Sequence, residues 1–177
     1  MTTFREMRRK RQALPAETCR EILTRTTSGT LAVLGDGGYP YAVPLNHVYH
    51  DGALYFHSAK AGHKLDAIRK DDKVSFCVVE QDLVVPEEYT TYYRSVVAFG
   101  RARIVEEREE KRRLLEYLAE RFCPGETERR AAEVANGLDR LVMIVMTIEH
   151  LTGKEAIELV RQREQSDAAE TPTVSLS

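Results

Sequence analysis

Residues 39–79 have the sequence YPYAVPLNHVYHDGALYFHSAKAGHKLDAIRKDDKVSFCVV, which contains a clear β-hairpin signal. Asp51-Gly52 lies between two β-prone runs, Tyr39–Tyr49 and Ala53–His57. An Asp-Gly pair supplies the positive φ angles of a tight turn, so these runs should pair as antiparallel strands. Proline cannot donate to a strand ladder. The two prolines of the first run therefore place it at a sheet edge, at a bulge or beside a ligand.

The rest of the chain continues this pattern of strands with peripheral helices. Apolar residues at helical spacing predict a short helix at Gly62–Lys70, and the run KVSFCVV predicts a strand at Lys73–Val79. Before and after this stretch the sequence predicts a short helix from Pro15, a strand at 29–34, a polar loop at 81–91 and a strand at 92–105 with a bulge at Gly100. It also predicts helices at 106–122 and 126–136, and a strand at 141–148 that is buried on both faces or lies in a barrel wall. The early turns are too short for parallel crossovers. We therefore expect a mainly β, α+β fold with a small closed or split barrel.

One domain accounts for the organisation of the 177 residues. Residues 1–14, with the basic run Arg8–Arg11, form an N-terminal arm, and residues 15–160 form the barrel domain. Residues 161–177 are polar and are expected to be a disordered tail. We expect the basic run to be solvated or covered by a partner rather than to bind nucleic acid.

Composition narrows the class of protein. The chain is 42% hydrophobic and 31% charged, which is typical of a globular domain, and its formal net charge is −2. That charge argues against nucleic acid or an anionic membrane as a partner. No apolar run approaches the roughly 20 residues that span a bilayer, and no secretory signal precedes the domain. Three cysteines without a CxxC pair favour a reducing compartment, so we expect a cytoplasmic protein.

Four of the five histidines fall between His47 and His63, which raises the question of a metal site. His47 and His50 are three residues apart, so in one strand they face opposite sides. No acidic or thiolate partner stands at ligand spacing, and we expect no bound metal.

A phosphate site is better supported. The segment His57–Lys64 contains a hydroxyl, two lysines and a glycine just before a predicted helix, where free N–H groups and the helix dipole favour an anion. Ordinary helix capping with solvated lysines is the alternative. Neither GxGxxG nor GxxxxGK[ST] occurs, so no Rossmann or P-loop cradle is available.

The quoted stretch resembles a known superfamily when its pieces are taken together. VPLN at 43–46, DGALYFHSA at 51–59 and GHK at 62–64, followed by KVSFCV, are similar to the pyridoxamine 5'-phosphate oxidase-like FMN-binding split barrels. YRSVVAFGRA at 93–102, LTGK at 151–154 and MRRK at 7–10 resemble the branch related to nitroimidazole-resistance proteins. The resemblance implies a six-stranded FMN-binding split β-barrel that works as a homodimer, with flavin mononucleotide in a cleft between subunits.

The resemblance also implies roles for particular residues. It implies that Ser58, His63 and Lys64 hold the cofactor phosphate, while the flavin ring edge meets Val43, Pro44, Leu45 and Asn46, and Arg94 and Ser95 approach from the long strand. His57 matches a histidine of the ligand pocket and is the candidate catalytic residue. Other roles stay open: Ser58 as a cap, Arg94 as the partner of an acidic neighbour, Asn46 as the holder of a bulge, and His57 as an interface residue.

Strand alternation gives an independent expectation for His57. Leu54 and Phe56 form the obvious core pair, so Tyr55 and His57 should lie on the opposite face and point outward.

These features lead to one predicted function and two alternative functions. The first is a flavin-dependent reductase of small substrates, nitroaromatic compounds among them. The rivals are a flavin or small-ligand-binding protein without turnover and a haem-handling relative of the same barrel. The C-terminal basic and aromatic substrate motif of pyridoxamine phosphate oxidases proper is absent, which argues against vitamin B6 oxidation. Residues Pro86–Tyr89 replace the Cys-and-aromatic stretch of nitroimidazole-resistance relatives, which leaves substrate preference open.

Overall fold

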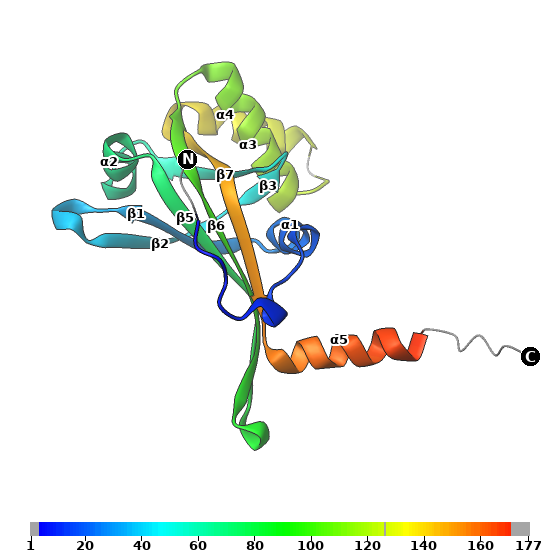
Figure 1. The fold of residues 1–177 in the computed structure, drawn as a ribbon. Helices are drawn as coiled ribbons and strands as arrows, with labels where there is room; N and C mark the ends of the chain where they lie inside the picture. Colours follow the sequence, from blue (N-terminus) through cyan, green and yellow to red (C-terminus); the bar gives the residue numbers. More distant parts are fainter. Residues whose placement is uncertain (1–3, 126, 171–177) are drawn as a thin grey trace, which may run out of the picture.

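The computed structural model describes residues 4–125 and 127–170, and its centre is an antiparallel sheet of seven strands in the order β2-β1-β5-β6-β7-β4-β3 (Figure 1). The strands are β1 Ser28–Leu34, β2 Pro40–Asn46, β3 Val48–His50, β4 Ala53–Ala59, β5 Lys73–Val85, β6 Thr90–Val105 and β7 Leu141–Glu155. The helices are α1 Ala16–Arg25, α2 His63–Lys70, α3 Arg108–Phe122, α4 Thr127–Arg140 and α5 Ile157–Glu170. None of the described helices is long and apolar enough to cross a membrane.

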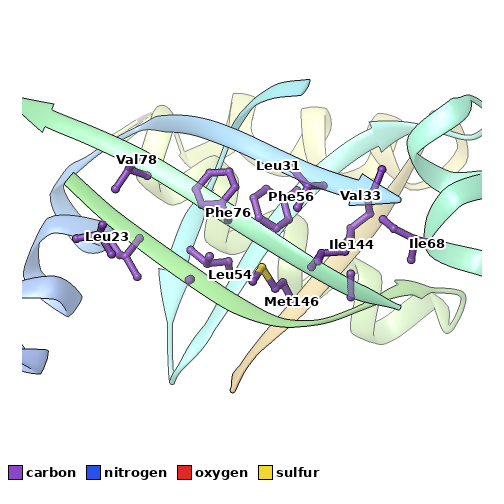
Figure 2. Packing of buried hydrophobic residues seen from close by; sticks show 14 of the residues in the cluster. Leu23, Leu31, Val33, Leu54, Phe56, Ile68, Phe76, Val78, Ile144 and Met146 are labelled. Carbon is purple, nitrogen blue, oxygen red and sulfur yellow. The ribbon is translucent and has the colours of Figure 1, made fainter. Parts of the chain in front are cut away.

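Strand β7 divides the hydrophobic interior into two cores. Ile144 and Met146 point into the barrel core, where they join Phe56 and Phe76 (Figure 2). The alternate residues Met143 and Val145 belong to a second core beneath α3 and α4. All four β7 side chains are almost fully buried, which confirms the expectation of a strand covered on both faces.

The sheet has seven strands rather than the expected six, because the run 39–49 breaks at His47. The His47 side chain is fully buried, and its Nε2 donates to the carbonyl of Leu23 at 3.0 Å. Burial lowers the pKa of His47, so the ring stays neutral near pH 7. Strand β2 pairs only with β1 and forms an edge, which is one of the three positions that its prolines left open, and the sheet is not closed.

The predicted polar loop at 81–91 is wrong. Strand β5 continues to Val85, and residues 86–89 turn the chain into β6. This hairpin extends away from the body of the molecule, and Leu83 and Val84 on it are 55% and 63% exposed (Figure 1). A strand without a buried face shows no apolar alternation, so periodicity could not reveal it.

The C-terminal part also differs from expectation. Strand β7 runs seven residues beyond Ile148, to Glu155, and α5 then continues to Glu170, where a disordered tail was expected from residue 161. Residues 171–177 of that expected tail lie outside the described residues, as do Met1–Thr3 of the N-terminal arm and Glu126 of the predicted second helix. The arm itself is anchored where Leu14 donates its N–H to the Gly153 carbonyl at 3.0 Å.

Candidate functional site

The β4–α2 connection brings the three predicted phosphate ligands close together in the chain. Ser58 is 4% exposed, and its Oγ has no hydrogen-bond partner in the described part of the chain. The residue at the start of α2 is Gly62, with φ 138°, and no side chain caps the helix. Ser58 therefore does not act as the helix cap, and its buried hydroxyl is left without a hydrogen bond among the described residues. Lys64, half-buried in the first turn of α2, adds a positive charge.

His63 joins α2 to the β1–β2 turn. Its ring stacks on Tyr41 with 4.3 Å between centroids, and its Nε2 accepts a hydrogen bond from the backbone N–H of Asp36 at 3.3 Å. The carboxylate of Asp36 binds Lys70 at 2.8 Å, and this hydrogen bond holds the pKa of Asp36 below its usual range. Because its ring nitrogen is already engaged, His63 is positioned by the fold before any ligand arrives.

The predicted ring-binding segment lies on edge strand β2. Val43 and Leu45 are partly buried against the barrel core, while Pro44 and Asn46 are exposed. Asn46 donates its side-chain N–H to the carbonyl of Thr27 at 3.0 Å, which ties the end of β2 to the start of β1. One edge of β2 has no strand partner, so its backbone groups are available to a ligand.

His57 faces outward, as alternation predicted, because Leu54 and Phe56 are fully buried on the other face of β4. The ring lies in a pocket of about 820 Å³ that it shares with Asn46. Helices α3 and α4 form the opposite wall, with apolar residues that include Leu118 and Val134. The structure therefore brings together two of the predicted site residues that come from different strands.

Arg94 and Ser95 do not join this pocket. Arg94 lies on β6, where Nη2 is 3.0 Å from the carboxylate of Glu155 and Nη1 is 3.5 Å from that of Glu80. Glu155 is 1% exposed and is also 3.1 Å from Arg163 of α5. The alternative role of Arg94, pairing with an acidic neighbour, is thus what the structure shows. Sequence reasoning missed Glu155, because no local pattern marks a carboxylate that pairs with an arginine 61 positions away.

Sequence reasoning also missed the charged side of the pocket. Arg129, Arg130, Glu133 and Arg140 of α4 all line it. These residues stand on the polar side of an amphipathic helix, which usually means a solvated face. Within the described residues, no group of three or more His, Cys, Asp or Glu side chains is arranged to hold a metal ion.

An open antiparallel sheet of seven strands, with a pocket between His57 of β4 and the helices α3 and α4, is the architecture expected of a split-barrel protein. The family model described as pyridoxamine 5'-phosphate oxidase matches residues 15–155. The chain therefore belongs to the pyridoxamine 5'-phosphate oxidase family, and the resemblance expected from the sequence is confirmed. No curated protein sequence matches the chain.

Solved structures agree with this assignment. A putative 5-nitroimidazole antibiotic resistance protein from Bacteroides thetaiotaomicron is similar over 81% of this chain and 86% of its own, with 19% identity and a TM-score of 0.69. An FAD and haem binding protein from Mycobacterium smegmatis is similar over 82% of this chain and 73% of its own, with 22% identity and a TM-score of 0.70. An FAD-binding protein from Mesorhizobium loti is similar over 81% of this chain and 96% of its own, with 28% identity and a TM-score of 0.57.

Proposed function

We propose that the protein binds flavin mononucleotide and acts as a flavin-dependent reductase of small molecules, nitroaromatic compounds among them. The observation that carries the proposal is the buried hydroxyl of Ser58, which has no hydrogen-bond partner among the described residues and comes four positions before Gly62, the uncapped start of α2. A buried polar group without a hydrogen bond is costly, and a phosphate at this place would satisfy it. The relative from Mesorhizobium loti, described as FAD-binding, supports a flavin as the ligand.

In this proposal each part of the site has a separate task. Ser58, Lys64 and the first N–H groups of α2 hold the phosphate, and His63 keeps the β1–β2 turn against them. The unpaired edge of β2 at Val43–Asn46 meets the rim of the flavin ring. The bound flavin supplies the electrons, while the chain supplies binding, orientation and electrostatics. His57 donates a hydrogen bond to the substrate in the pocket, so His57→Gln should lower the reductase rate and leave flavin affinity unchanged.

Replacing Lys64 by alanine tests the phosphate site. The loss of a hydrogen bond between charged groups costs about 1.5–3 kcal/mol, so we expect FMN affinity to fall about tenfold to a hundredfold. Quenching of flavin fluorescence on titration measures this directly. Riboflavin has no phosphate, so it should bind weakly to the natural protein and respond little to the substitution.

Lys60→Ala is the matched control, because Lys60 lies in the same connection and is exposed. It removes the same charge outside the proposed ligand set and should leave FMN affinity nearly unchanged. Equal losses of FMN and riboflavin in Lys64→Ala would contradict a phosphate-binding role. FAD, titrated in parallel, distinguishes the two flavin nucleotides.

We also propose that the working form is a homodimer. The β5–β6 hairpin exposes the apolar side chains Val79, Leu83, Val84 and Tyr89, and such a surface is typical of an interface. In one protomer the predicted ligands Arg94 and Ser95 lie apart from the others, and a two-fold partner could bring its own pair to the cleft. Light scattering at micromolar concentration should give about 40 kDa, twice the chain mass of 20.1 kDa. A mass of one chain would overturn the shared cleft.

A second candidate function is haem binding, and one observation favours it. His57 lies in a pocket with apolar walls and arginines, which suits an axial ligand, an apolar porphyrin and its carboxylates. The relative from Mycobacterium smegmatis is described as binding both FAD and haem. Haem and a flavin in separate sites would also be compatible with the β4–α2 phosphate site.

A further inference from the structure

The pocket beside His57 has the size and lining of a small-molecule site. Its volume of about 820 Å³ falls within the range of typical ligand pockets, roughly 300–1,000 Å³. Leu115 and Leu118 of α3 and Val134 of α4 give it an apolar wall. These three side chains belong to the second core, so the wall is held rigidly by the fold.

The pocket carries an excess of positive charge from α4, which contributes three arginines and one glutamate to its lining. Nine arginines from Arg11 to Arg112 have a carboxylate within ion-pair distance, whereas Arg113 and Arg121 have none among the described residues. On α4, Arg140 is 4.0 Å from Glu133, and both line the pocket. Arg129 and Arg130 also line it and have no carboxylate partner among the described residues. Among the described residues, the wall therefore carries two arginines without an ion-pair partner, and its one glutamate, Glu133, lies near Arg140.

Helical spacing explains how this arrangement arises. Arg130, Val134 and Gly137 are three or four residues apart, so they lie along one side of α4. Gly137 has no side chain, and α4 therefore packs against Leu115 without filling the hollow. Arg130 is half-buried at the polar end of this stripe. An apolar floor thus leads directly to the guanidinium group of Arg130, which has no ion-pair partner in the part of the chain that the structure describes.

We infer that this pocket binds the substrate of the reductase, and that the substrate is a small carboxylate or phosphate with an apolar body. Arginine forks bind carboxylate and phosphate with paired hydrogen bonds, which are stronger than those between neutral groups. The apolar body packs on the α3–α4 wall, and its far end reaches His57. That this ligand is a substrate rests on the proposed reductase function, whereas its chemical class follows from the lining of the pocket alone.

Two probes with the same ring system test the inference in the full-length protein loaded with FMN. 2-Naphthoate carries a carboxylate and 2-naphthamide does not, and calorimetric titration gives the affinity of each. We expect naphthoate to bind at least tenfold more tightly. The double variant Arg129→Gln/Arg130→Gln should abolish that difference and leave FMN affinity unchanged.

The control is Arg108→Gln/Arg112→Gln, which removes the same charge from exposed positions of α3 outside the pocket. It should keep the preference for naphthoate, and a thermal melt by circular dichroism checks that both double variants fold. Equal binding of the two probes, or a preference that survives Arg129→Gln/Arg130→Gln, would overturn the inference. A loss of FMN affinity in that variant would also overturn it, because the arginines would then hold the flavin.

Two further measurements distinguish the ligands that the pocket could bind. If haemin displaces naphthoate and gives a Soret band that His57→Gln abolishes, the pocket is a haem site and the substrate assignment fails. If the protein does not bind FMN but retains the arginine-dependent preference for naphthoate, the proposed reductase fails and the ligand class of the pocket stands.

Discussion

Replacing Arg94 by alanine is expected to lower the free energy of unfolding by about 3 kcal/mol, the cost of leaving a buried carboxylate short of its partner. Glu155 is 1% exposed and receives two hydrogen bonds from Arg94, from Nε at 3.2 Å and from Nη2 at 3.0 Å. Arg163 stays 3.1 Å from the same carboxylate, so the loss should fall at the lower end of the range for broken buried pairs. Urea denaturation of the two proteins measures the difference.

A double variant isolates the ion pair from the packing of the two side chains. Arg94→Leu/Glu155→Met removes both charges and keeps apolar volume, so it should recover most of the stability lost in Arg94→Ala. Flavin affinity, measured on the same proteins, addresses the role predicted from the sequence. If Arg94→Ala unfolds at the same urea concentration as the natural protein but no longer binds FMN, Arg94 is a cofactor ligand and not a structural partner of Glu155.

What the sequence could predict at this site depends on how local each signal is. The outward position of His57 followed from alternation with Leu54 and Phe56, because neighbouring residues of a strand must face opposite sides. The edge position of β2 was one of the three that its prolines left open, because proline cannot donate to a ladder. Both signals lie within a few residues of the feature that they predict.

The features that were missed depend on partners far away in the chain. Arg94 and Glu155 meet only because β6 pairs with β7, which no local pattern specifies. The pocket itself needs α3 and α4 to pack on the face of the sheet that carries His57, a tertiary arrangement that helical periodicity leaves open. The first part of the β5–β6 hairpin was mistaken for a loop because the hairpin extends from the body of the molecule without a buried face, and alternation appears only where one face is buried.

Gly100 shows how a local signal and a tertiary constraint can coincide. The sequence predicted a bulge there because glycine interrupts a long strand, and the pairing of β6 with β7 does shift register between Phe99 and Gly100. A Cβ atom at this position would clash with the carbonyl oxygen of Thr147 and would lie 2.9 Å from its carbonyl carbon. Both are backbone atoms of β7, the strand fixed between the two cores, so they cannot move aside.

Gly100→Ala should therefore destabilise the protein by about 3 kcal/mol, at the upper end of the cost of overpacking a core. Gly137→Ala is the matched control: it is also a buried glycine, but its added Cβ would lie 3.4 Å from Leu115 Cδ1, an ordinary contact. Alanine is also better than glycine inside a helix by about 1 kcal/mol, so this variant should be as stable as the natural protein or slightly more so. Urea midpoints at equal m-values compare the two variants. An unchanged midpoint for Gly100→Ala would mean that the β6–β7 ladder can open at the bulge, and that the position does not fix the bend of the barrel.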